Sequence, residues 1–143
     1  MPPLPRALRQ ALRAEVHAPR CAYCQSPEQL LGMPLEVDHI IPEAAGGKTE
    51  LTNLCFCCRS CNGYKWQHTH ARDAQTGRRV RVFHPRQQRW AIHFVWSADG
   101  ASLLGRTVTG RATIGRLRMN NDLISDLRRL WVTLGLHPRA MER

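Results

Sequence analysis

Residues 21–24 read Cys-Ala-Tyr-Cys and residues 58–61 read Cys-Arg-Ser-Cys, and this pair of motifs decides the fold of the chain. Each motif spaces two thiols as a zinc knuckle does, and a zinc ion held by four thiolates is closed to substrate. We therefore predict a structural Zn²⁺, whose binding energy stabilises a module with too small a core to fold without it. The predicted ligands are Cys21, Cys24, Cys58 and Cys61.

Two further cysteines leave the second ligand pair open, because Cys55 and Cys58 also have the Cys-x-x-Cys spacing. Cys55 and Cys57 alternate with Phe56, a pattern that fits small buried residues of a strand better than it fits metal ligands. We favour Cys58 and Cys61 as ligands, and the roles of Cys55 and Cys57 stay open at this stage.

The residues between the cysteine motifs predict two strands and a helix. Residues 36–41 are rich in β-branched side chains and end at Pro42, which is typical of a strand. A turn-rich loop follows with Gly46-Gly47, then a second short strand at 53–57 and a helix at 59–67. Two strands and a helix that close over one metal site form a ββα arrangement.

Asp38 and His39 lie next to each other in the first predicted strand and form the candidate catalytic pair. Hydrolysis of a phosphodiester needs an activated water and stabilisation of the charge on the phosphate. The carboxylate of Asp38 suits Mg²⁺ or Mn²⁺, and the imidazole of His39 can take a proton from water near neutral pH. Neighbouring side chains of a strand point to opposite faces. The strand would therefore need a bend or bulge for Asp38 and His39 to reach the same metal centre.

These segments together resemble the motif of the HNH endonuclease family with zinc-binding cysteines. The resemblance is carried by Val37–Pro42, Gly46-Gly47, Leu51–Leu54 and Cys58–Lys65, and it is specific over residues 21–65. The later part of the chain is similar to the tail of small bacterial stand-alone HNH proteins. The resemblance implies a ββα-metal (His-Me finger) fold.

The resemblance also implies roles for four residues. His39 matches the general base, and Asp38 matches the carboxylate that binds the catalytic metal. Asn53 matches the middle residue, whose side chain bonds the backbone and so orients His39. Asn62 stands where the final histidine usually lies as the second metal ligand, which makes this an HNN variant. An amide oxygen favours Mg²⁺ or Mn²⁺ over softer metals.

The predicted fold class is α+β with three parts. Residues 1–20 hold an N-terminal helix, residues 21–70 the ββα-metal module, and residues 71–143 an α+β extension that packs on it. The role of this extension is not predicted. Its expected elements are strands at 80–83, 90–96 and 102–104 and helices at 109–117 and 122–134.

The last of these helices is expected to begin at a cap formed by Asn121-Asp122 and to end at Gly135. Its leucines and Trp131 fall on one face, which we interpret as core. That face consists of Leu123, Leu127, Leu130 and Trp131.

The charge of the chain favours a polyanionic partner. The 21 Lys and Arg residues outnumber the 11 Asp and Glu residues, for a net charge of +10, and phosphate contacts dominate most nucleic-acid affinity. We predict DNA as the partner, with RNA left open, and little sequence preference, since no base-reading motif is evident. The predicted contacts are Lys65, followed by Arg59 and Arg20.

The function predicted from the sequence is a metal-dependent endonuclease that acts on DNA. One alternative is a non-catalytic, zinc-stapled nucleic-acid-binding module, and another is the nuclease subunit of a restriction or defence assembly with a protein partner. No apolar run approaches the ~20 residues of a membrane helix, so no membrane partner is expected. Six cysteines without a secretory signal predict a cytoplasmic location. Oligomeric state, and nicking versus double-strand cleavage, are not predicted.

Overall fold

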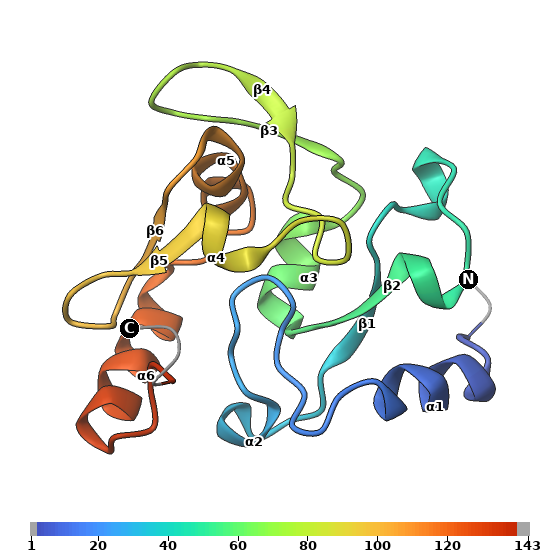
Figure 1. Ribbon diagram of the computed structural model, residues 1–143, viewed down its shortest axis with the longest axis horizontal. Coiled ribbons are helices and arrows are strands. Elements are labelled where there is room, and N and C mark those ends of the chain that lie inside the picture. Colours follow the sequence, from blue (N-terminus) through green and yellow to red (C-terminus); the bar gives the residue numbers. More distant parts are fainter. Residues whose placement is uncertain (1–2, 140–143) are drawn as a thin grey trace. The chain divides into compact units, whose positions relative to one another are not determined.

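The computed structural model describes residues 3–139, which form two compact units. The first unit contains the chain up to Thr69 and the short segment His84–Gln87, and the second contains His70–Phe83 and the chain from Gln88 onward (Figure 1). No helix within the described residues is long and apolar enough to cross a membrane.

The first unit is built around a two-stranded antiparallel sheet followed by a helix. Strand β1 (Glu36–His39) pairs with β2 (Leu54–Cys57), and helix α3 (Arg59–Lys65) comes directly after. All four residues of β2 are buried, as expected for a short apolar run with small cysteines. The expected ββα order and the α+β class are confirmed, with both strands and the helix somewhat shorter than predicted.

The loop between the strands contains two short 3₁₀ turns, η1 (Glu43–Ala45) and η2 (Leu51–Asn53). Gly46 has φ +90°, which favours glycine, and a Cβ on Gly47 would lie 1.7 Å from the carbonyl oxygen of Ile41. The Gly-Gly pair is therefore required by a left-handed turn and by a close backbone approach.

Helix α1 (Arg6–Ala14) lies within the segment predicted as the N-terminal helix and covers part of β2. Its Leu12 is buried, and Arg13 forms a bidentate ion pair with Glu28 at the start of helix α2 (Glu28–Leu31). Arg86 explains why residues after Phe83 return to this unit. Its Nε donates to the Leu54 carbonyl at 2.8 Å, and its guanidinium pairs with Glu15.

The described residues of the second unit form two hairpins and three helices. Strands β3 (His70–Arg72) and β4 (Arg79–Arg81) pair with each other, as do β5 (Phe94–Trp96) and β6 (Leu103–Gly105). The helices are α4 (Trp90–His93), α5 (Val108–Arg116) and α6 (Asp122–Thr133), and α5 contacts β3, β4 and β6.

Two expectations for this unit were wrong. Residues 90–93 form the helical turn α4 where a strand was predicted, and only residues 94–96 are extended. Helix α6 begins at the expected cap, with Asn121 Oδ1 accepting from the Ile124 amide, but Leu123 is 84% exposed and Leu130 is 54% exposed. The buried face instead centres on Arg128, which is fully buried because backbone carbonyls of Ala101 and Met119 accept its hydrogen bonds.

Candidate functional site

Four cysteines of the first unit meet at one point. The Sγ atoms of the cluster all lie within 4.8 Å of one another, and Cys24 and Cys58 are 3.7 Å apart. A tetrahedral zinc with Zn–S bonds of about 2.3 Å would place its sulfurs about 3.8 Å apart, so the cluster fits this ion. Sulfur contacts, Cys21 first, lower the pKa of the Cys24 thiol well below its ordinary value. The cluster consists of Cys21, Cys24, Cys58 and Cys61, the ligand set predicted from the sequence.

Local backbone contacts bring the two halves of this cluster together. The first half lies in the loop before α2, and the Ala22 amide donates to the Phe56 carbonyl of β2. The second half begins α3, where the Cys58 sulfur accepts from the Cys61 amide and caps the helix. The cysteines therefore connect the N-terminal loop, β2 and α3.

Cys55 and Cys57 lie outside the cluster and are buried. Burial raises the pKa of each thiol to about 12, so both stay protonated at neutral pH. The Cys55 thiol lies 3.9 Å from the hydroxyl of Tyr23 and 4.0 Å from Asp38 Oδ2. These two residues behave as small buried side chains of β2.

Asp38 is buried, with 5% of its surface exposed, and has two strong partners. The Tyr23 hydroxyl donates to Oδ2 at 2.8 Å, and Lys65 Nζ lies 3.0 Å from Oδ2 and 3.2 Å from Oδ1. Burial raises the pKa of Asp38 above its ordinary value, and the charge of Lys65 opposes that shift. The sequence did not indicate Tyr23, because it lies inside a zinc-binding motif.

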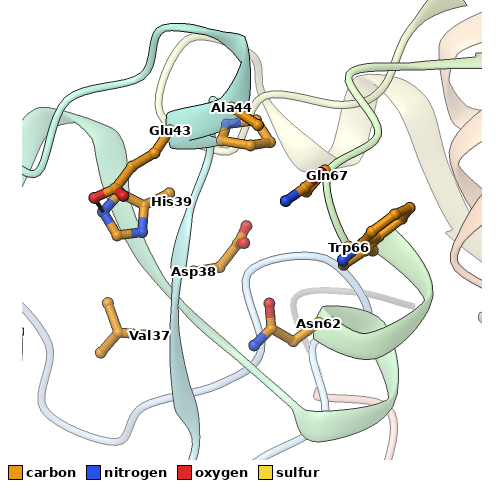
Figure 2. Close-up of a pocket in the computed structure, with 9 residues that line it drawn as sticks. Val37, Asp38, His39, Glu43, Ala44, Asn62, Trp66 and Gln67 are labelled. Atoms are coloured by element: carbon orange, nitrogen blue, oxygen red, sulfur yellow. Dashed lines mark ion pairs between the residues drawn. The ribbon is translucent and has the colours of Figure 1, made fainter. Parts of the chain in front are cut away.

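Asn62 lies across from Asp38 on helix α3. Its Nδ2 donates to Glu36 Oε1 at 2.9 Å, which fixes the amide. Figure 2 shows the Asp38 carboxylate and the Asn62 amide oxygen pointing toward one space, with Trp66 and Gln67 beside it. This cavity of about 340 Å³ is open to solvent on one side. Glu36 was missed from the sequence, although it lies two residues before Asp38 and therefore on the same strand face.

His39 extends from the opposite side of β1 (Figure 2). The pairing of β1 with β2 is regular through His39, so the bend or bulge considered from the sequence is not present. The structure thus places the imidazole and the Asp38 carboxylate on either side of the strand, with both residues lining the 340 Å³ cavity. His39 also lines a second cavity of about 430 Å³ together with Arg9 of α1 and Thr49.

A short hydrogen-bond chain fixes which nitrogen of the His39 ring acts as the donor. Thr49 Oγ1 donates to Glu43 Oε1 at 2.8 Å, and its oxygen lies 2.9 Å from His39 Nε2. The hydroxyl proton is used by the carboxylate, so Nε2 must carry the proton that it shares with Thr49. The neutral imidazole then has its free electron pair on Nδ1. No sequence pattern indicated Thr49 or Glu43.

Asn53 holds the loop that follows His39. Its Oδ1 accepts from the Ile41 amide, and its Nδ2 donates to the carbonyls of Ile41 and Lys48, all at 2.9 Å. The Asn53 carbonyl also accepts from the Ile40 amide at 2.8 Å. The amide is buried, so these bonds fix the backbone on the carboxyl side of His39.

The three predicted nucleic-acid contacts differ in position. Arg59 is exposed at the start of α3. Arg20 is half-buried and donates to the Gln25 carbonyl at 3.0 Å. Lys65 has no exposed surface and donates to Asp38 and to the His39 carbonyl. The position of Lys65 therefore does not fit the predicted phosphate contact, because the ammonium would first have to leave its buried partners.

Comparison with known proteins identifies one segment. Residues 21–67 match the model of the HNH endonuclease family. No curated protein and no solved structure matches the chain. The matched residues include both zinc-binding motifs, β1, β2 and α3, so this segment is similar to HNH endonuclease domains, and the likeness favours a nuclease-type function that uses a metal.

Proposed function

We propose that this protein is a metal-dependent endonuclease that hydrolyses phosphodiester bonds of DNA. The observation that carries the proposal is the arrangement around β1. The Asp38 carboxylate and the Asn62 amide oxygen face one cavity, and His39, with Nδ1 free to accept a proton, lines the same cavity.

Asp38 and Asn62 would hold Mg²⁺ or Mn²⁺, since one offers a carboxylate and the other an amide oxygen to the same space. Glu36 fixes the Asn62 amide through Nδ2 and so leaves Oδ1 for this purpose. When bound, the ion would stabilise the charge on the phosphate and assist the departing oxygen.

His39 is the proposed general base. Its Nδ1 takes a proton from the attacking water, while Nε2 stays bonded to Thr49. Glu43 accepts from Thr49 and lies 3.4 Å from Nε2, so its carboxylate favours the imidazolium that forms. Asn53 holds the adjoining loop rigid. When the water attacks the phosphorus and the 3′ oxygen departs, the products have 5′-phosphate and 3′-hydroxyl ends.

DNA is the proposed substrate because the chain carries a net charge of +10 and exposes arginines on the elements that carry the candidate site. Arg9 of α1 lines the second cavity with His39, and Arg59 is exposed at the start of α3. Both can contact the phosphates that flank the bond to be cut.

A non-catalytic nucleic-acid-binding module is the second candidate. The observation that favours it is the ion pair between Lys65 and Asp38, which neutralises the carboxylate that a catalytic metal needs. In that case the ββα unit would only dock on DNA.

Cleavage of supercoiled plasmid separates the two functions. We expect nicked or linear DNA with Mg²⁺ or Mn²⁺ and none without a divalent ion. His39→Ala should lower the rate by at least about a hundredfold, as for loss of a general base. His17→Ala is the matched control, since His17 is exposed and lines neither cavity. Equal cleavage by His39→Ala and wild type would end the proposal, and tight binding without cleavage would favour the docking module.

A further inference from the structure

The hairpin of β3 and β4 gathers basic side chains on one face. In its register His70 lies opposite Arg81, Ala71 opposite Val80, and Arg72 opposite Arg79. Since side chains alternate between the faces of a strand, Ala71 and Val80 share one face and the basic residues share the other. The apolar face packs with Ala112 of α5 and Val82. The basic face consists of His70, Arg72, Arg79 and Arg81.

Within the described residues, the charges of Arg79 and Arg81 are not balanced by ion pairs with carboxylates. Within residues 3–139 neither Arg79 nor Arg81 forms an ion pair, and both side chains are exposed. The carboxylate of the hairpin, Asp73, is buried and bound to Arg111 on α5. Like charges directly opposite each other destabilise a strand pair. Burial, together with the charges of the two arginines, lowers the pKa of His70. The hairpin therefore keeps an arrangement that costs it stability.

The hairpin is also held firmly. The Asp73 amide donates to the Arg78 carbonyl at 2.8 Å, and the Gly77 amide donates to the Asp73 carbonyl at 2.7 Å, which close the turn. The ion pair between Asp73 and Arg111 fixes the turn to α5. A rigid ribbon presents its arginines without a large entropic cost on binding.

We infer that this basic face binds the phosphate backbone of nucleic acid, as a docking surface in the second unit. Arg79 and Arg81 are two residues apart on one strand, about 7 Å along it, and each guanidinium can hold a phosphate with two hydrogen bonds. Such contacts carry no base information and supply affinity independent of sequence. The inference and the proposed nuclease function both concern nucleic acid as the ligand. They are otherwise independent, because the hairpin does not need the Asp38 site to bind phosphate.

Binding of a fluorescently labelled DNA duplex tests the inference, measured by anisotropy across a salt series. The protein carries His39→Ala so that cleavage does not interfere. Adding Arg79→Ala and Arg81→Ala should reduce the slope of log K against log salt by about 1.8, or 0.9 for each lost phosphate contact. Affinity at low salt should fall on the order of tenfold or more. The charge-matched control is Arg89→Ala with Arg106→Ala, two exposed arginines of the second unit outside the hairpin.

An equal slope for the hairpin variant and the control would overturn the inference. A double lysine variant, Arg79→Lys with Arg81→Lys, keeps the charge and should keep most of the slope, which separates lost contacts from lost folding. If the double lysine variant shows the same reduced salt slope as the alanine variant, and its free energy of unfolding is unchanged, phosphate binding by charge is also contradicted. The anisotropy assay measures binding alone. If the plasmid is not cleaved, the proposed nuclease function fails, but the test of the basic face is unaffected.

Discussion

Lys65 and Asp38 form an ion pair in the interior of the first unit, with 3.0 Å between Nζ and Oδ2, and no part of the Lys65 side chain is exposed. The carboxylate that lies on the ββα site is thus neutralised by a cation of the protein itself. A divalent ion at Asp38 and the Lys65 ammonium would compete for the same oxygens. On the proposed function, the ion pair would therefore stabilise the metal-free site and weaken its affinity for the divalent ion.

Lys65→Met separates these two effects. It removes the ammonium but keeps an apolar side chain of similar length, so Mn²⁺ should bind more tightly by calorimetry. In the absence of divalent ion the free energy of unfolding should fall by about 3 kcal/mol, because the buried Asp38 carboxylate loses its cationic partner. Lys48→Met is the control, since Lys48, the other lysine of the chain, is exposed. Unchanged Mn²⁺ affinity in Lys65→Met would show that the two cations do not compete.

The cysteine cluster predicts one zinc per chain. Cys21→Ser should lose the zinc and unfold the first unit, since metal binding energy is folding energy in a site of this kind. Cys55→Ala should keep the zinc, because the Cys55 thiol faces Tyr23 and lies outside the cluster. Metal content by mass spectrometry of the native protein measures both. Loss of zinc from Cys55→Ala would mean that the ligand set is wrong.

The cysteine cluster and the ββα order could be predicted because they depend on patterns within short stretches of the sequence. The Cys-x-x-Cys spacing of Cys21 and Cys24 indicates a pair of zinc ligands, and the β-branched run of residues 36–41 predicts a strand whatever surrounds it. The Gly46-Gly47 pair likewise reports a local backbone requirement. Patterns of this kind can be interpreted without knowledge of tertiary contacts.

The positions that could not be predicted depend on partners far away in the sequence. Lys65 lies in a polar run and was interpreted as a surface cation, but its partner Asp38 is 27 residues away. Arg128 is buried because carbonyls of Ala101 and Met119 accept its hydrogen bonds, and this turns Leu123 outward. A buried charge cannot be predicted from its neighbours in sequence, since its cost is offset by contacts that only the fold creates.

The backbone of Trp66 is strained beside the candidate site, and substitutions at this position measure that strain. It caps α3 with φ 46° and ψ −123°, a conformation that residues with a Cβ rarely adopt, and it lines the cavity of Asp38. Trp66→Gly should be more stable than Trp66→Ala by about 1 kcal/mol, because only glycine adopts this backbone without strain. Urea unfolding compares the two variants, which lack the same indole ring. Equal stability would mean that the backbone is not strained.

The ion pair between Asp73 and Arg111 predicts how acid affects the hairpin. The Arg111 guanidinium holds the pKa of Asp73 well below its ordinary range. A depressed folded-state pKa gives stability that is full above the unfolded value of about 3.9 and is lost as the pH falls through the folded value. Asp73→Asn should therefore destabilise the second unit at pH 7, and the difference from wild type should shrink steadily below about pH 4.

Amide hydrogen exchange of β3 and β4 is the suitable measurement, because the thiolates of the zinc site in the first unit also take up protons in acid. Asp126→Asn serves as the control, since its ion pair with Arg129 is exposed to solvent and contributes little. A difference between Asp73→Asn and wild type that stays constant from pH 7 to pH 3 would contradict the assignment, because the loss would then come from packing and not from the carboxylate charge. If the difference shrinks as expected, the ion pair that fixes the hairpin turn to α5 also limits the stability of the hairpin in acid.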